Sequence, residues 1–295
     1  MKTAPVKSKW FGFLQIPEGK RGAFAVRHRH YGAGSVFRTS SARTAIFAGH
    51  ECVKLTLDGP VVVHELCEND GVWMTDLPIE QAQIDPLLDG MNGRVLVGGL
   101  GLGYAAQMLA LHPKVESVWV IEKSPEVIEL VAKHLRGNSR KGRKSKIRVI
   151  QADLFEWLAH PDQQCSRFDW AFYDIWAPDG ERVFFEQVVP LRRLTGDKVN
   201  PERVRCWNED VMRGQLLMHM TTRVQMLKHP EMFVDLGLTL DKLCEPVGGK
   251  MHASFDFGVP FFCAIRDGKV PLAEAPRVAA AYVRDFGIPG RVLPW

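Results

Sequence analysis

The first ninety residues alternate short apolar runs with polar turns, a pattern typical of β-structure. The runs at 45–48, 53–57 and 61–66 are rich in β-branched residues. Asp58-Gly59 separates the last two runs, and this dipeptide favours a tight turn between paired strands. We therefore predict a β-rich N-terminal domain over residues 1–90, with a hairpin at Asp58-Gly59.

From residue 94 the pattern changes to apolar strands that alternate with amphipathic helices. We expect strands at 95–97, 117–121, 146–150 and 168–173, and helices at 78–88, 104–111, 126–134 and 154–158. This alternation predicts a parallel sheet covered by helices. The expected fold class is α/β, with a Rossmann-like domain over residues 91–295. Within it, residues 180–230 favour helix, and 251–265 (MHASFDFGVPFFCAI) favours a strand hairpin.

Composition limits the class of protein. The chain has 295 residues, of which 46% are hydrophobic and 24% charged, as in globular domains. Its net charge of +4 is too small to imply a nucleic-acid or membrane partner. The six cysteines have no CxxC spacing and the ten histidines form no HExxH, so we expect reduced thiols and no metal site. Without a long apolar run, we expect a cytoplasmic protein.

One segment concentrates positive charge. Seven lysines and arginines lie between Arg136 and Arg148 without an acidic residue. Such a cluster can neutralise phosphates, but no aromatic residue is interleaved to stack on bases. A solvated loop is the favoured interpretation, and nucleic-acid binding is the open alternative.

Three glycines carry the strongest signal for chemistry. Gly99, Gly101 and Gly103 come directly after a predicted strand and directly before a predicted helix. Glycine is favoured there because the backbone turns sharply and a Cβ would collide with a ligand lying across the turn. Gly101, Gly103 and Ala106 also fit the G-x-G-x-x-A pattern, so the glycines alone leave a nicotinamide cofactor open.

Acidic residues follow the next three predicted strands, at Glu122, Asp153 and Asp174. Because the carboxyl ends of parallel strands share one edge, we expect these side chains to converge with the glycine turn. Glu122 is placed to accept from ribose hydroxyls, and Asp153 from an adenine amine. The simpler alternatives are a solvated acid at Glu122 and a helix N-cap at Asp153, and Asp153 can serve both roles.

These residues carry a resemblance. Three parts of the sequence resemble the class I S-adenosylmethionine-dependent methyltransferase fold. They are VLVGGLGLG, VIEKSPEVIEL with IRVIQADLFEWL, and FDWAFYDIWAP. Within that fold the chain is most similar to the spermidine-synthase-like branch, and LTLDGP resembles the hairpin of its N-terminal β domain. The resemblance implies S-adenosylmethionine, or its decarboxylated form, as cofactor, and a possible homodimer.

By this resemblance, Gly99, Gly101 and Gly103 wrap the methionine end, Glu122 the ribose and Asp153 the adenine. Asp174 corresponds to the first acid of the DxxDP stretch, which deprotonates the attacking amine in aminopropyltransferases. The second acid of that stretch is Ala177 here, so a linear polyamine fits poorly.

Candidates for substrate contact are Asp76, Glu80 and Trp176. For the two acids the alternative is a capped surface helix, and for Trp176 it is packing in the core or lid. The leading hypothesis is a transferase that moves a methyl group from S-adenosylmethionine to a small molecule or protein. The alternatives are an aminopropyltransferase that uses decarboxylated S-adenosylmethionine, and a non-catalytic nucleoside-binding scaffold.

Overall fold

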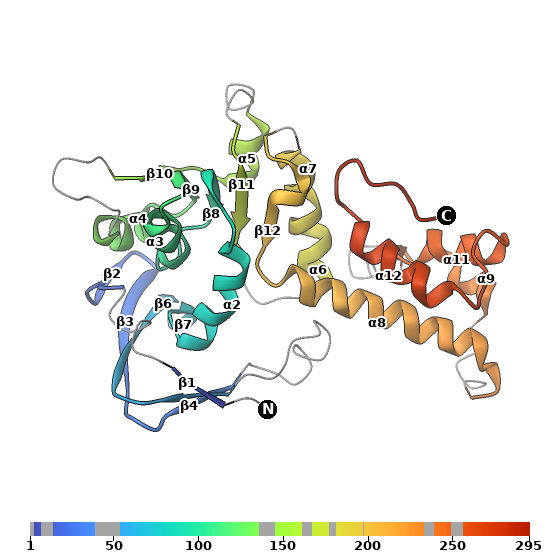
Figure 1. Cartoon of the computed structure of the whole chain (residues 1–295), viewed down its shortest axis with the longest axis horizontal. Coiled ribbons are helices and arrows are strands. Elements are labelled where there is room, and N and C mark those ends of the chain that lie inside the picture. The colour runs from blue at the N-terminus through green and yellow to red at the C-terminus, as the bar shows by residue number, and fades with distance from the viewer. Residues whose placement is uncertain are drawn as a thin grey trace. The chain divides into compact units, whose positions relative to one another are not determined.

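The computed structural model describes residues 3–6, 14–38, 54–135, 145–160, 167–176, 181–196, 198–232, 239–248 and 256–295 (Figure 1). The predicted strand at 45–48, most of the basic run 136–148 and Ala177 lie outside these residues. The chain divides into two compact units. The first is formed by residues within 1–45, 51–177 and 194–207, and the second by residues within 178–193 and 208–295. The boundary expected after residue 90 falls inside the first unit, so a separate N-terminal domain stays a prediction.

The N-terminal part of the first unit is β-rich, as predicted, and forms two sheets. The antiparallel sheet has the order β2 (Gly19–Arg21), β3 (Phe24–Tyr31), β6 (Val61–Glu68), β7 (Gly71–Thr75). The other has the order β1 (Thr3–Val6), β5 (Lys54–Leu57), β4 (Val36–Arg38). The hairpin expected at Asp58-Gly59 is wrong, because β5 and β6 belong to different sheets. A two-residue hairpin closes with an N–H at its fourth residue, and Pro60 has none.

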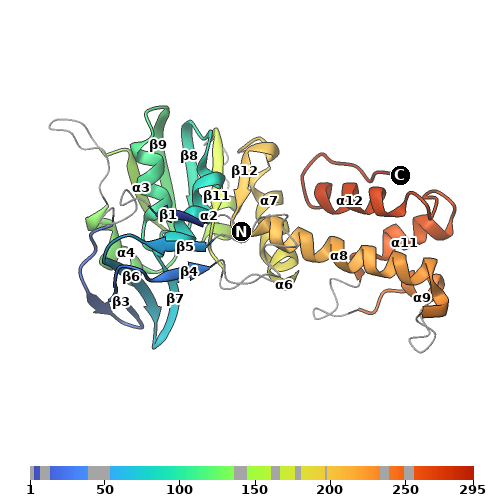
Figure 2. The same cartoon turned by 60° about the horizontal axis from the view of Figure 1, so that its bottom comes forward.

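The predicted parallel sheet is confirmed. Its order is β10 (Ile147–Gln151), β9 (Val115–Glu122), β8 (Gly93–Gly98), β11 (Trp170–Tyr173), β12 (Val204–Cys206). All four pairings are parallel, and Figure 2 shows β9, β8, β11 and β12 side by side. In chain order this is 3-2-1-4-5, a Rossmann-like order whose direction reverses between β8 and β11.

Helices precede the strands of this sheet or connect them. They are α2 (Pro78–Leu88), α3 (Tyr104–Leu111), α4 (Pro125–Val131) with the 3-10 turn η2 (Ala132–His134), α5 (Leu154–Ala159) and the 3-10 turn η5 (Pro201–Arg203). Val118 and Val120 are buried in one core with apolar residues of α3 and α4. Side chains alternate along a strand, so Trp119 faces the other side, where its ring lies 5.6 Å from that of Phe168. Both faces of the sheet are therefore covered near its middle.

The second unit is helical over the described residues. Its elements are α6 (Glu181–Val183), the π-helical turn η4 (Phe184–Val188), α7 (Val189–Thr195), which runs on into the first unit, α8 (Glu209–Lys228), the 3-10 turn η6 (Pro230–Met232), α9 (Leu240–Leu243), α11 (Val259–Arg266) and α12 (Ala275–Asp285). The expectation that 180–230 is mostly helical is thus confirmed in the described part of that range, although β12 interrupts it.

The hairpin expected at 251–265 is wrong, because residues 259–266 form α11. Pro260 stands in the first turn of this helix, where its missing N–H costs nothing. Phe261 and Phe262 are both buried, although neighbours in a strand would point to opposite faces. Phe261 packs on Tyr282 of α12 at a ring distance of 6.4 Å, so an aromatic core favours the helix.

A buried ion-pair network also holds this unit together. Glu209 at the start of α8 accepts from Arg192 Nη2 of α7 at 2.7 Å and from Arg213 Nη2 at 2.6 Å. Arg213 donates in addition to the backbone carbonyls of Val283 and Phe286. The network therefore ties α7 and α8 to the end of α12. No helix in the described part of the chain is long and apolar enough to cross a membrane.

Candidate active site at the carboxyl edge of the parallel sheet

The glycine turn lies at the point where the strand order reverses. The N–H of Gly99 donates to the carbonyl of Ile121 on β9 at 2.9 Å, and the N–H of Asp174 after β11 donates to Gly98 at 3.0 Å. The ends of β9 and β11 therefore flank the turn that follows β8. Open α/β sheets bind ligands at this kind of position.

The turn requires glycine for reasons that the structure makes specific. Gly99 and Gly101 have φ angles of +90° and +49°, which favour residues without a Cβ. A Cβ on Gly99 would fall against the carbonyl of Asp174, and one on Gly101 against the Sδ of Met74 from β7. Gly103, also with positive φ, precedes α3. Met74 is a site neighbour that sequence analysis missed, and no local pattern marks it.

Glu122 ends β9 and holds two backbone donors. Its Oε2 accepts from Leu100 N–H in the glycine turn at 2.8 Å, and its Oε1 accepts from Ser124 N–H at 2.7 Å. The side chain is half-buried. A carboxylate offers about four lone-pair sites, so each oxygen retains the capacity for one more donor. Glu122 is therefore more than a solvated acid, because it fixes the turn.

Asp153 caps α5, as the simpler alternative proposed. Its Oδ1 accepts from Phe155 N–H at 2.9 Å and from Glu156 N–H at 3.3 Å. Its Oδ2 lies 3.0 Å from Nζ of Lys123, whose side chain is 80% exposed. Burial acts to raise the pKa of Asp153, but Lys123 and the two N–H donors outweigh it and hold the pKa below its usual value. Asp153 is thus an ionised acid beside the end of β9.

Asp174 and Glu80 form an acidic pair beside the turn. Burial first, and then the charge of Glu80, raises the pKa of Asp174 to about 7. Glu80 on α2 accepts from Thr75 N–H at 3.1 Å and from Thr75 Oγ1 at 2.8 Å. Burial raises the pKa of Glu80 despite these hydrogen bonds. Two carboxyl groups with raised pKa values at one edge suit the uptake of a proton or the binding of a cation.

Asp76 has a different environment. Its Oδ1 accepts from the backbone N–H of His64 at 2.6 Å, and its Oδ2 lies 2.7 Å from Nδ1 of the same histidine. Both side chains are buried. The position of His64 opposite Asp76 in sheet pairing could not be found from local sequence. Both Asp76 oxygens are engaged, which gives it a role in orienting β6 against the start of α2.

Trp176 follows Asp174 by two residues and is 4% exposed. Its Nε1 is buried and has no hydrogen-bond partner among the described residues. A buried indole N–H usually has an acceptor, so an acceptor for this atom is expected outside the described residues or on a bound molecule. The structure thus gathers the glycine turn, Glu122, Asp153 and Asp174 at one edge, with Glu80 close enough to act on Asp174. No group of three or more His, Cys, Asp or Glu side chains suited to a metal ion occurs among the described residues.

Comparison with known proteins gives distant structural likeness. No protein-family model matches the chain, and no curated protein sequence does. A spermidine synthase from Thermotoga maritima is 18% identical with a TM-score of 0.33, covering 47% of this chain and 45% of that one. A spermidine synthase in complex with the transition state analogue AdoDATO is 15% identical with a TM-score of 0.36, covering 64% of this chain and 57% of that one.

Human methyltransferase-like protein 13 in complex with SAH is 19% identical with a TM-score of 0.29. That alignment covers 42% of this chain and 59% of the human one. The chain thus spans less than two thirds of each of these solved structures. The inference about activity rests on the residues at the edge of the sheet.

Proposed function

We propose that the chain binds S-adenosylmethionine at the carboxyl edge of its parallel sheet and transfers the methyl group to a small molecule or protein. The observation that carries this proposal is the placement of the glycine turn at the reversal of strand order, flanked by Glu122 and Asp174. Asp153 follows the neighbouring strand. A sheet held only by packing does not require acids or glycines after four successive strands.

The residues fit the cofactor that the sequence suggests. Glu122 keeps lone pairs for two ribose hydroxyls after binding Leu100 and Ser124. Asp153 can accept from the adenine amine, provided that the exposed Lys123 side chain moves from Oδ2. The free Nε1 of Trp176 suits an acceptor atom of a substrate.

The bound cofactor would supply an activated methyl group on a sulfonium. This chain's contribution is alignment, together with removal of a proton where the acceptor must lose one. Asp174 is the proposed base. With a pKa raised to about 7 by burial and by Glu80, it takes up a proton more readily than an ordinary carboxylate near neutral pH.

Aminopropyl transfer is the second candidate, and one observation favours it. Ala177 replaces the second acid expected of a polyamine site, but Glu80 supplies another carboxyl group near Asp174. Two acids facing one site would compensate an ammonium group that becomes buried on binding.

Calorimetry with the two nucleosides tests both candidates. The methyltransferase proposal expects S-adenosylmethionine to bind at least as tightly as its decarboxylated form, and tighter binding of the decarboxylated form would favour aminopropyl transfer. Mass spectrometry of the purified protein for co-bound nucleoside comes first. A pocket without turnover is indicated if Asp174→Asn leaves every cellular phenotype intact while Glu122→Ala abolishes it.

A cytoplasmic location and a homodimer are part of the same proposal. The absence of CxxC spacing among six cysteines supports a reducing compartment. Microscopy of the tagged chain and light scattering of the purified chain test these two statements.

A further inference from the structure

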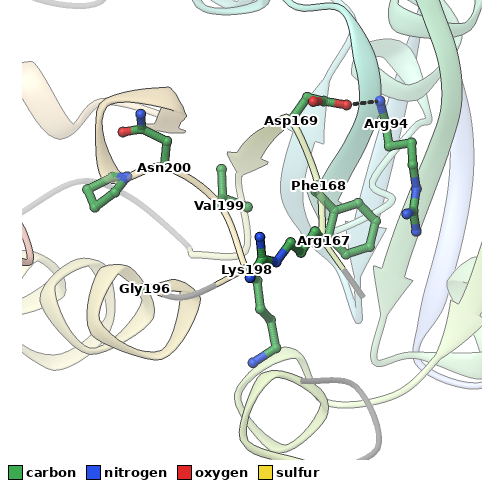
Figure 3. A pocket seen from close by; sticks show the side chains of 9 residues that line it. Arg94, Arg167, Phe168, Asp169, Gly196, Lys198, Val199 and Asn200 are labelled. Carbon is green, nitrogen blue, oxygen red and sulfur yellow. Dashed lines mark hydrogen bonds between the residues drawn. The ribbon is translucent and has the colours of Figure 1, made fainter. Parts of the chain in front are cut away.

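A cavity lies at the edge of the parallel sheet opposite the candidate active site. It has a volume of about 710 Å³, within the usual range of small-molecule sites. Arg94, in its wall, is the second residue of β8, and Asp169 directly precedes β11. Figure 3 shows these side chains together with Arg167, Phe168 and Lys198. The cavity therefore opens at the amino ends of strands whose carboxyl ends carry the candidate active site.

The cavity wall carries three cations that no described acid neutralises. Arg94, Arg167 and Lys198 form no ion pair with any described aspartate or glutamate. The guanidinium of Arg94 lies over the Phe168 ring, 5.3 Å from its centre, and makes no polar contact with a described side chain. Arg167 is exposed, and its guanidinium has no described partner, so all five of its N–H donors are available.

Lys198 is the least expected of the three, because it is only 6% exposed. Its Nζ donates to the carbonyl of Leu158 at 2.8 Å. A carbonyl satisfies one of three donors and leaves the positive charge without a counter-ion, which is costly in a buried setting. An anion in the cavity that Lys198 lines would offset part of that cost.

One acid lines the cavity, and it is committed to the backbone. Oδ2 of Asp169 accepts from the N–H of Arg94 at 2.8 Å (Figure 3). Against three cations it leaves the described wall with two net positive charges. Asn200 uses its Oδ1 to accept from Glu202 N–H, which leaves its amide group free to donate. Apart from Oδ1 of Asp169, the side-chain groups that remain available in the described wall are therefore donors.

We propose that this cavity binds a phosphate group. Guanidinium groups pair with phosphate oxygens in a bidentate geometry, and a focused positive field concentrates such anions. The phosphate could be a free ion or part of a single-stranded nucleic acid. The second source has a physical basis in the half-buried Trp119, which packs on the buried Phe168 and has the guanidinium of Arg148 4.4 Å from its ring centre. The basic run 136–148 has no aromatic residue in its sequence, but in the folded chain Arg148 lies beside the aromatic ring of Trp119.

The test measures binding of inorganic pyrophosphate and of a short single-stranded oligonucleotide by calorimetry at low and high salt. Arg167→Gln and Lys198→Gln should each weaken pyrophosphate binding by about tenfold, as expected for the loss of one charge-assisted contact. Arg277→Gln is the matched control, because Arg277 is an exposed arginine in the other unit. Arg167 is exposed, so its variant remains informative even if Lys198→Gln fails to fold.

The oligonucleotide distinguishes the two sources. A nucleic-acid surface is identified if the oligonucleotide binds at least tenfold more tightly than pyrophosphate. Its affinity should then fall steeply as the salt concentration rises, and fall also in Arg148→Gln. A site for a single phosphate group is identified if the oligonucleotide binds no more tightly than pyrophosphate and its affinity is unchanged in Arg148→Gln. The proposal is overturned if neither probe binds at millimolar concentration, or if Arg167→Gln and Arg277→Gln have the same effect.

Discussion

The carboxylate of Glu122 accepts a hydrogen bond of 2.8 Å from the backbone N–H of Leu100, and this bond joins the end of β9 to the glycine turn. The same carboxylate accepts from Ser124 N–H at the start of α4. One acid therefore positions two segments of the proposed nucleoside site, besides offering lone pairs to a ligand.

Replacing Glu122 by alanine should weaken binding of S-adenosylhomocysteine by about 2 kcal/mol, or roughly 30-fold, because hydrogen bonds to a charged group are lost. Calorimetry measures this change. Glu116→Ala is the control, since Glu116 is an exposed acid on the same strand. Unchanged affinity in Glu122→Ala, with lower thermal stability alone, would show that Glu122 serves the turn and not the ligand.

Activity should rise with pH to a plateau, with a midpoint near 7 in kcat/KM. Asp174 acts as a base only when it is deprotonated, and its pKa is raised to about 7 by burial and by Glu80. Glu80→Gln removes the second of these causes, so the midpoint should move to lower pH. Asp174→Asn should lose the pH dependence together with most of the activity. A midpoint that stays in place in Glu80→Gln would contradict the electrostatic coupling of the two acids.

Gly101→Ala should destabilise the chain more than Gly34→Ala does. Both glycines have positive φ, so each substitution carries a backbone cost of about 1 kcal/mol. Only the Cβ at Gly101 also meets Met74 Sδ, whereas the space at Gly34 is open. Urea denaturation measures the difference, and adding Met74→Ala to Gly101→Ala should remove part of it. Equal losses for the two single variants would exclude a tight contact with Met74.

Glu209→Gln should destabilise the second unit by about 3 kcal/mol or more, because it leaves two arginines near a buried amide without a counter-charge. Burial acts to raise the pKa of Glu209, but Arg192 and Arg213 outweigh it and hold the pKa below its usual value. The stabilisation is therefore present at neutral pH and is lost as pH falls through the lowered pKa. Thermal unfolding at pH 7 and at acid pH measures both effects, with the exposed Glu186→Gln as control. A loss as small as that of Glu186→Gln would contradict the role assigned to the network.

The sequence predicted the parallel sheet well because its signals are local. The strands that end at Gly98 and Glu122 contain the continuous apolar runs 95–97 and 118–121, and α3 begins and ends at Tyr104 and Leu111 as the pattern indicated. The N-cap at Asp153 was visible for the same reason, since the acid and the N–H groups that donate to it are three residues apart or less. Local periodicity carries this information without knowledge of the fold.

Features that depend on distant neighbours could not be read in this way. Met74 lies against Gly101 only because β7 packs near the turn, and His64 reaches Asp76 through the pairing of two strands. The apolar run that ends at Ile265 was assigned to strands. Its helical form depends on packing against Tyr282, which lies farther along the chain and which the local pattern does not reveal. Pro60 was a local signal against the hairpin that the Asp58-Gly59 dipeptide outweighed.

The two backbone hydrogen bonds of Glu122 limit how this chain can be engineered. In dinucleotide-binding sheets the acid after the second strand contacts the ribose, so exchanging that acid is the direct way to alter cofactor preference. In this chain that exchange would also remove the hydrogen bonds from the N–H groups of Leu100 and Ser124. A change of cofactor preference would therefore also disturb the glycine turn. Redesign should keep Glu122 and vary Lys123, whose exposed side chain touches the site without holding it together.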